Sequence, residues 1–323
     1  MTSRRRLLAA TGAALALPRI SAAQEGFPSR SVTIVVPFPP GGGTDVLARI
    51  LGQHFQEAWR QPVVTENRGG GAGRIGMQIV QRAQPDGHTL MVTSTGGMMG
   101  LAGAEHRFVV REHLTPITLV AAPAYVVAMH PGVGARNVGE LIALAKSRPP
   151  GHFTFGSSGT GAASHLAAEL FASMAGIEML HVPYRGTGPA LTDLVAGRIH
   201  LMFAPPQTVA SAVAAGQVVN LAVTSERRTA LLPGLPTAAE SGLPGYSAVG
   251  WFGLFAPRGV PPAIAERIAA DAARALTLRE TRERMAGLGA EPEPMTPDAF
   301  SAYVDADIAK WQSVVRERNI TLE

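Results

Sequence analysis

The sequence of 323 residues predicts an α/β protein of two Rossmann-like lobes joined by two crossing strands. Three observations predict this fold. Short β-branched strands alternate with amphipathic helices, which is typical of a parallel sheet covered by helices on its faces. The apolar segments Ile117–Met129 and Val249–Ala256 are placed so that the chain can leave one lobe and later return. Glycine-rich loops follow strands in both halves, where the carboxyl edges of open sheets bind ligands.

Residues 1–23 have the pattern of a signal peptide. Three adjacent arginines, Arg4–Arg6, precede the apolar stretch Leu7–Leu17, and the small residues Ser21–Ala23 follow it. The arginines resemble a twin-arginine signal, and the Sec route fits as well, so both stay open. A cytosolic amphipathic helix is the alternative. We expect the mature chain to begin near Gln24 and to function in the periplasm.

The first lobe is expected to comprise residues 24–122 and 252–323. Its strands are predicted over 31–37, 62–65 and 88–93 by their β-branched composition. Helices are predicted over 46–58, capped by Thr44 or Asp45, and over 75–83. Three helices are expected after Pro257. The last begins at Thr296-Pro297-Asp298, and its apolar stripe has helical spacing: Phe300, Val304, Ile308, Trp311 and Val315.

The second lobe is expected to comprise residues 123–251. Asn137 is predicted to cap a helix that ends at Lys146, and Thr187 to cap one that ends at Ala196. A further helix is predicted over 162–175. Strands are predicted over 153–155, 179–182, 199–203 and 218–224. A turn-rich stretch, Leu232–Gly245, precedes the second crossing strand.

Composition and charge exclude several classes of protein. The chain has no cysteine, which excludes disulfide scaffolds, iron–sulfur clusters and thiolate zinc sites. Its net charge of +4 comes from the first 23 residues, and the remainder carries 24 basic and 24 acidic residues. No nucleic-acid partner is therefore expected.

Three strand-to-helix loops could bind an anion: Pro39–Asp45, Ser157–Ser164 and Arg185–Thr187. Glycine allows backbone N–H groups to face a ligand, and a helix N-terminus adds a partial positive charge. Hydroxyl groups add further donors, from Thr44, Ser157, Ser158, Thr160, Ser164 and Tyr184. The simplest ligand for such loops is a small carboxylate. The alternative is that they are ordinary connections with capped helices.

The motifs of several enzymes fail on inspection, so no catalytic residue, cofactor or metal is expected. Gly71–Gly76 matches G-x-G-x-x-G, but the acidic residue expected about 20 positions later is missing. The sequence around Ser158 lacks the second glycine of a nucleophile elbow. His165 is interpreted as a polar residue in a first helical turn rather than a base. Trp251 and Trp311 are interpreted as core residues.

Several strings resemble the tripartite tricarboxylate transporter receptors, also called Bug or TctC-type solute receptors. They begin with V-P-F-P-P-G-G-G-T-D at Val36–Asp45 and continue with E-N-R-G-G-G-A-G-R-I-G at Glu66–Gly76. G-S-S-G-T-G-A-A-S-H-L at Gly156–Leu166, V-P-Y-R-G-T-G-P-A-L-T-D-L at Val182–Leu194 and W-F-G-L-F-A-P at Trp251–Pro257 follow in the same order. The resemblance covers nearly all of residues 27–318.

The resemblance implies a two-lobed, type II-like periplasmic binding fold that closes on a small carboxylate. It also implies a membrane permease with one large and one small subunit as the partner. A monomer without catalytic activity is expected. Carried over by position, the implied ligand-binding residues are Phe38, Pro39, Gly42, Gly43, Thr44, Asp45, Thr93, Ser94, Ser157, Ser158, Gly159, Thr160, Gly161, Ser164 and Tyr184.

Two departures from the family pattern affect the expected ligand. Met98–Leu114 is shorter than in many relatives and lacks their N-P-x-L-Y segment. Ala204–Pro206 stands where relatives often have a polar or acidic residue, so an apolar wall is expected there. Such a wall disfavours an amino acid and favours a carboxylate without an amine, aromatic or aliphatic. A sensor-kinase ectodomain is the alternative partner, and an exported hydrolase the alternative activity.

Overall fold

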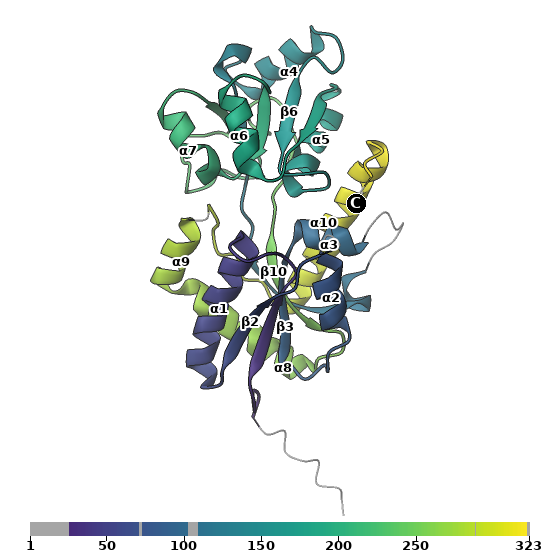
Figure 1. The fold of residues 1–323 in the computed structure, drawn as a ribbon, viewed down its shortest axis with the longest axis vertical. Coiled ribbons are helices and arrows are strands. Elements are labelled where there is room, and N and C mark those ends of the chain that lie inside the picture. Colours follow the sequence, from purple (N-terminus) through teal and green to yellow (C-terminus); the bar gives the residue numbers. More distant parts are fainter. Residues whose placement is uncertain (1–25, 71–72, 103–108, 288, 322–323) are drawn as a thin grey trace, which may run out of the picture.

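The computed structural model describes residues 26–70, 73–102, 109–287 and 289–321, and it contains two mixed sheets (Figure 1). We call each sheet with its covering helices a lobe. The crossing segments connect the two lobes, with the second lobe at the top of Figure 1. The expected signal peptide, 1–23, lies outside the described residues. The α/β fold of two lobes is confirmed.

The first sheet has the strand order β2-β1-β3-β10-β4. β1 is parallel to β2 and β3, whereas β10 is antiparallel to both β3 and β4. The parallel pairing of β1 with β2 and β3 agrees with the expected parallel sheet, and the returning strand β10 adds to it in the opposite direction. The strands are β1 (Val32–Val36), β2 (Val63–Asn67), β3 (Thr89–Ser94), β4 (Leu114–Ala121) and β10 (Phe252–Pro257).

Helices surround this sheet on both faces (Figure 1). The predicted side-chain cap of the last helix is confirmed, since Thr296 Oγ1 accepts the Ala299 N–H at 3.3 Å. The predicted stripe on that helix is buried throughout. The helices are α1 (Gly43–Trp59), α2 (Arg74–Gln81), α3 (Thr95–Ala102), α8 (Pro262–Thr277), α9 (Arg279–Ala286) and α10 (Pro297–Glu317), with a 3₁₀ turn at Val110–Glu112.

The second sheet has the order β7-β6-β8-β5-β9. It is mixed because β5, the strand that enters this lobe from the first crossing segment, runs opposite to its neighbours. β6 is parallel to β7 and β8, whereas β5 is antiparallel to β8 and β9. The strands are β5 (Val126–Met129), β6 (Thr154–Ser157), β7 (Leu180–Pro183), β8 (Leu201–Ala204) and β9 (Val219–Val223). The helices are α4 (Val138–Lys146), α5 (Ala163–Ala175), α6 (Thr187–Val195) and α7 (Pro206–Ala214), with a 3₁₀ turn at Pro131–Val133.

Two predicted helix caps are wrong, and glycines take their place. Gly42 is the N-cap of α1 and Gly186 that of α6, and neither helix has a side-chain cap. Gly186 has a φ of 109°, which a threonine there could hardly adopt. The predicted cap at Asn137 is confirmed, since its Oδ1 accepts the Glu140 N–H at 2.8 Å.

The crossing segments form a short two-stranded link. Ile117–Met129 is not one strand: it is divided between β4 and β5, which belong to different sheets. Of the second predicted crossing strand, only the part from Phe252 lies in a sheet. Between the lobes, Ala124 pairs with Val249, and the Gly250 N–H donates to the Pro123 carbonyl at 3.2 Å. The lobe boundaries at 122/123 and 251/252 stay a prediction.

Close packing requires a glycine at Gly76, the last position of the G-x-G-x-x-G motif. A Cβ on Gly76 would lie 2.8 Å from the Arg68 carbonyl and from Pro37. α2 therefore packs directly on the loops that follow β1 and β2. Gly71 and Ala72 lie outside the described residues. Within those residues, no helix is long and apolar enough to cross a membrane.

Candidate functional site

A cavity of about 360 Å³ lies between the lobes, beside the crossing segments. It brings together Phe38 and Ser94 of the first lobe with Ser158–Gly161 of the second, all of them predicted site residues. The residues that the prediction missed are Thr95, Gly96, Met99, Pro123, Tyr125, Ala162, Ala163, Gly250, Trp251 and Phe252.

Asp45 supports the first-lobe wall from behind and does not line this cavity. Its carboxylate accepts the Gly41 N–H at 3.0 Å and the Arg49 guanidinium at 3.1 Å. Arg49 also donates to Asn67 Oδ1, and Asn67 in turn donates to the Phe38 carbonyl at 3.1 Å. Burial raises the pKa of Asp45, but these hydrogen bonds outweigh it and hold that pKa below its usual value. An ionised carboxylate thus fixes the loop that carries Phe38.

The first-lobe wall continues along the end of β3 and the start of α3. Thr95 and Trp251 exchange two hydrogen bonds: the Thr95 N–H donates to the Trp251 carbonyl, and the Trp251 N–H donates to Thr95 Oγ1. Thr93 lies beneath, fully buried, and its hydroxyl has no partner among the described residues. A Cβ on Gly97 would lie 2.5 Å from that hydroxyl, so α3 packs closely over Thr93.

The second-lobe loop uses most of its amide hydrogens internally. Ser164 Oγ accepts the Ser158 N–H at 3.1 Å, and Ser157 Oγ accepts the Gly159 N–H at 3.1 Å. His165 Nδ1 accepts the Gly161 N–H at 3.0 Å. Ser157, Ser164 and His165 are buried, so they hold the loop from below rather than facing the cavity.

The Ala162 N–H also donates to the Gly159 carbonyl at 3.2 Å, so the N–H groups that α5 leaves available begin at Ala163. Its N-cap, Ala162, provides no side-chain cap, and both Ala162 and Ala163 line the cavity. The first N–H groups of a helix have no partner inside it, and they lie at the positive end of its dipole. The uncapped N-terminus of α5 therefore offers the cavity an anion-binding end that carries no formal charge.

Tyr125 brings a phenol to the crossing segments, which sequence reasoning did not anticipate. Its backbone is fixed by Thr224, whose N–H donates to the Tyr125 carbonyl and whose Oγ1 accepts the Tyr125 N–H. Burial raises the pKa of the hydroxyl to about 12, so the phenol stays protonated and can donate. A Cβ on Gly250 would lie 3.1 Å from this hydroxyl, so glycine keeps space beside it.

Trp251 and Phe252 form the aromatic side of the cavity. Trp251 is also a core residue, as predicted, since it is 1% exposed and its indole N–H donates to Asp307 at 2.8 Å. Trp311 donates to the same carboxylate oxygen at 2.9 Å. The aromatic wall is thus anchored to α10. Among the described residues, no charged side chain lines this cavity.

The other predicted site residues lie behind the cavity or away from it. Tyr184 donates to Asp193 at 2.7 Å, and neither Arg185–Thr187 nor Ala204 lines the cavity. The segment Ala204–Pro206, where an apolar wall was expected, does not line this cavity, and Pro206 lines a different one. The residues concerned are Pro39, Gly42, Gly43, Thr44, Asp45, Thr93, Ser157, Ser164 and Tyr184.

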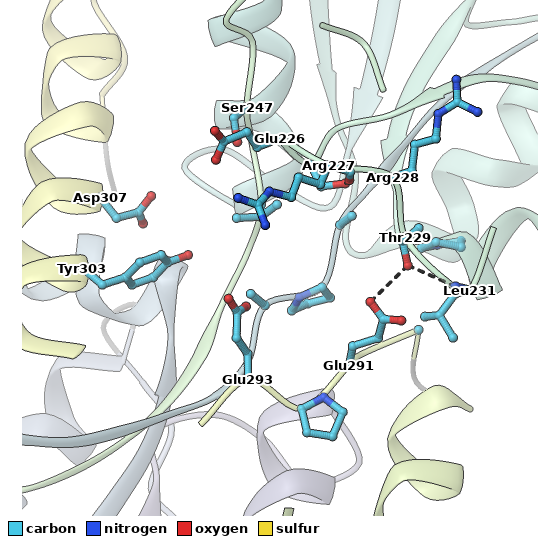
Figure 2. Close-up of a pocket in the computed structure, with 18 of the residues that line it drawn as sticks. Glu226, Arg227, Arg228, Thr229, Leu231, Ser247, Glu291, Glu293, Tyr303 and Asp307 are labelled. Carbon is cyan, nitrogen blue, oxygen red and sulfur yellow. Dashed lines mark hydrogen bonds between the residues drawn. The ribbon is translucent and has the colours of Figure 1, made fainter. Parts of the chain in front are cut away.

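That second cavity, which we call the rear cavity, has a volume of about 690 Å³ and is shown in Figure 2. Ala124 and Val249 line it, whereas their neighbours Tyr125 and Gly250 line the first cavity. Its charged lining residues are Glu226, Arg227, Arg228, Glu291, Glu293, Asp307 and Lys310. None of the predicted site residues lines it, so the smaller cavity is the candidate ligand site.

The structure thus combines two α/β lobes with an uncharged cavity at their link, an arrangement that suits the binding of a small solute. The sequence profile of the tripartite tricarboxylate transporter family receptor matches residues 47–320. The chain belongs to this family, as the resemblance implied. Because the members are receptors, the expectation that it is not an enzyme is confirmed.

Similar proteins span nearly the whole chain. The chain is 37% identical over 324 residues to the UPF0065 protein in the tcbD–tcbE intergenic region of Pseudomonas sp., which covers 97% of this chain and 94% of that one. It is 33% identical to the protein BugT of Bordetella pertussis, with 98% and 99% covered.

Two of the similar solved structures contain a carboxylate. Rpa4515 of R. palustris with adipate is 33% identical, has a TM-score of 0.72, and covers 91% of this chain and 99% of its own. MatC from Rhodopseudomonas palustris with bound malate is 32% identical, has a TM-score of 0.71, and covers 90% and 100%.

Proposed function

We propose that the protein is a periplasmic receptor that captures a small carboxylate without an ammonium group and delivers it to a membrane transporter. The observation that carries this proposal is the cavity of about 360 Å³ with the uncapped N-terminus of α5 at its second-lobe wall. The ligand would be enclosed between the two lobes, which would close around it.

The chemistry of the wall favours a carboxylate. A carboxylate accepts hydrogen bonds only, and the polar groups at this wall are hydroxyls and helix-terminal N–H groups that can donate. The hydroxyls are those of Ser94, Thr95, Tyr125, Ser158 and Thr160. The partly exposed aromatic side chains of Phe38 and Phe252 would pack against the hydrocarbon part of the ligand.

The uncharged lining supports a ligand without an ammonium group over an amino acid. An ammonium group enclosed here would have no carboxylate partner among the lining residues that the structure describes, and an unpaired buried charge is costly. The adipate and malate bound by two similar proteins both lack an amine.

The predicted residues outside the cavity would then act by holding its walls. Asp45 with Gly41–Thr44 would fix the first-lobe loop, and Ser157 with Ser164 would fix the second-lobe loop. Delivery would require a permease with one large and one small membrane subunit, approached by a monomeric receptor exported through its N-terminal segment.

Calorimetry with matched ligand pairs tests the proposal. The protein is unfolded, dialysed and refolded to remove bound ligand, then titrated with malate against aspartate and with adipate against 2-aminoadipate. We expect saturable binding of at least one amine-free acid and at least about tenfold weaker binding of its amino partner. Mass spectrometry of ligand released from the untreated protein identifies the physiological acid.

Two results would contradict the proposal. One is that no carboxylate in a broad panel gives saturable heat, and that no carboxylate is released from the untreated protein. The other is that the amino acids bind as tightly as their amine-free partners. The second result alone would still be consistent with a carboxylate receptor, but it would contradict the proposal that the ligand lacks an ammonium group.

A further inference from the structure

Four ionisable side chains lie together under the second-lobe loop, and none of them lines the ligand cavity. His165 and Glu169 come from α5, His181 from β7, and Arg318 directly follows α10 of the first lobe. His165 is 3% exposed and Glu169 is 7% exposed. The proposed function assigns no role to this cluster.

His165 connects the cluster to the loop. Its Nδ1 accepts the Gly161 N–H at 3.0 Å, which requires that Nδ1 carry no proton, because an amide N–H can only donate. The proton of the neutral ring then lies on Nε2, which faces Glu169 Oε1 at 3.6 Å. Protonation of Nδ1 would set two donors against each other and break the contact with Gly161.

Glu169 holds the far side of the ring and links it to the first lobe. Its Oε2 accepts from Arg318 Nε at 2.7 Å. Burial raises the pKa of Glu169, but hydrogen bonds from His165 and Arg318 outweigh it and hold that pKa below its usual value. The C-terminal end of α10 thus reaches α5 of the other lobe, as Figure 1 also shows.

A second support runs beside the first. Ser157 Oγ accepts the Gly159 N–H and lies 2.7 Å from His181 Nε2, and the His181 ring stacks on His165. Gly159 and Gly161 have φ values of +138° and +75°. Both glycines of the loop therefore have positive φ values, and each has its N–H held by an acceptor beneath it.

We propose that His165 is a positioning residue for ligand binding, which holds Gly161 so that the start of α5 stays open to the cavity, and which releases it when Nδ1 is protonated. The inference rests on the proposed function. The charged and titratable groups that contact the ring are Glu169 on its own helix, which Arg318 holds, and His181 from β7. Because Nδ1 can accept the Gly161 N–H only while it carries no proton, a proton on Nδ1 should weaken ligand binding through this residue.

Two variants separate positioning from folding. In His165→Asn, the side-chain Oδ1 can replace Nδ1 as the acceptor without titrating, whereas His165→Leu removes the acceptor. We expect His165→Asn to bind within about threefold of the wild type at about pH 7.5, and His165→Leu at least about tenfold more weakly. Between about pH 7.5 and 5, the affinity of the wild type should fall more steeply than that of His165→Asn. Titration of the ligand affects both proteins equally, so the difference between the two pH profiles reports on His165.

His130→Leu is the matched control. His130 Nδ1 accepts the Gly132 N–H at 3.1 Å, which is the same kind of contact in a 3₁₀ turn that does not line the cavity. This variant should bind like the wild type at both pH values. Thermal unfolding of all variants shows which of them fold. If His165→Leu does not fold, the pH profile of His165→Asn tests the inference by itself.

Hydrogen exchange of the peptide that contains Gly161 gives a readout that needs no ligand. In the ligand-free protein, His165→Leu should exchange this amide at least about tenfold faster than the wild type, and His165→Asn should protect it. Unchanged affinity and exchange in His165→Leu, or a pH profile of His165→Asn as steep as that of the wild type, would overturn the inference. A wild type that binds no carboxylate would overturn the proposed function instead, and hydrogen exchange would still test His165.

Discussion

His165 and His181 stack face to face, with ring centroids 3.8 Å apart and planes inclined by 16°. Phe155 packs beside both rings, with its centroid 4.9 Å from that of His181 and 6.1 Å from that of His165, so three rings cluster beneath the loop. Two imidazoles at this distance cannot both carry a charge without strong repulsion. Burial and the nearby His165 accordingly lower the pKa of His181 to about 4, although Glu169 acts in the opposite direction.

The depressed pKa of His181 predicts acid sensitivity of the fold. In the unfolded chain the pKa of a histidine is about 6.5. Between about pH 6.5 and 4, His181 is therefore protonated in the unfolded state and neutral in the folded state. The free energy of unfolding should therefore fall as the pH falls through this range, by about 2 kcal/mol from this residue. His181→Gln keeps a polar partner for Ser157 and should flatten the dependence, measured by urea unfolding at several pH values. An equally steep dependence in the variant would show that other groups cause it.

Ala163→Pro tests the amide hydrogen at the first position of α5. Proline is tolerated at that position and removes its N–H, and Ala162 already has the extended conformation (φ −64°, ψ 154°) that a residue before proline prefers. We expect carboxylate affinity to fall at least about tenfold, the effect of losing one hydrogen bond to a charged group, with thermal stability little changed. Arg279→Pro is the matched control, because its helix α9 also begins after an extended residue, Leu278 at φ −64° and ψ 140°. If both variants bind the carboxylate as tightly as the wild type, the N-terminus of α5 does not contact the ligand.

Tyr125→Phe tests the phenol at the crossing segments. The hydroxyl stays protonated because burial raises its pKa to about 12, so it can donate to a carboxylate at any physiological pH. We expect this variant to bind the carboxylate about tenfold more weakly, as calorimetry would measure. Tyr246→Phe is the control, because the buried Tyr246 hydroxyl donates to the Ala167 carbonyl at 2.9 Å and does not line the cavity. We expect this variant to lose about 1 kcal/mol of unfolding free energy and to keep the affinity of the wild type for the carboxylate. A Tyr125→Phe variant that binds like the wild type would show that the phenol does not contact the ligand.

Asp307→Ala tests the anchor of the aromatic wall. This buried carboxylate accepts both the Trp251 and the Trp311 indole N–H, so its loss leaves two buried donors without a partner. We expect the free energy of unfolding to fall by about 3 kcal/mol, as urea unfolding would measure. Lys310→Ala removes only the partly exposed ammonium that pairs with Asp307 and should cost about 1 kcal/mol or less. Similar losses in the two variants would show that the ion pair, not the indoles, accounts for the stability.

The alternation of β-branched runs, glycine loops and capped helices was sufficient to predict both lobes and most elements. It missed α3 because T-G-G-M-M-G-L-A has no polar face and contains three glycines, so neither periodicity nor helix propensity marks it. Burial of Met98, Met99 and Ala102 stabilises this helix instead. The strand directions could not be read from the chain either, because β5 and β10 become antiparallel only through their positions in the sheets.

The site was predicted only where its residues lie in the sequence motifs. Ser158–Gly161 was found because glycines and hydroxyls before a helix are a local signal. Tyr125, Trp251 and Phe252 were missed because they are ordinary apolar residues that enter the cavity only through the crossing segments. Sequence also could not show which amides remain available, since the acceptor for Gly161 is a histidine that was interpreted as a polar residue of the first turn.

The rear cavity has a practical consequence. Since Ala124 and Val249 of the link line the rear cavity and their neighbours Tyr125 and Gly250 line the first one, we expect a rotation that narrows one cavity to widen the other. Thr229 of the second lobe donates to Glu291 of the first across that cavity at 3.2 Å (Figure 2). The chain contains no cysteine, so a single thiol introduced at Thr229 could be labelled uniquely with an environment-sensitive fluorophore. Such a conjugate would be an optical sensor for the captured acid, with its dye remote from the ligand.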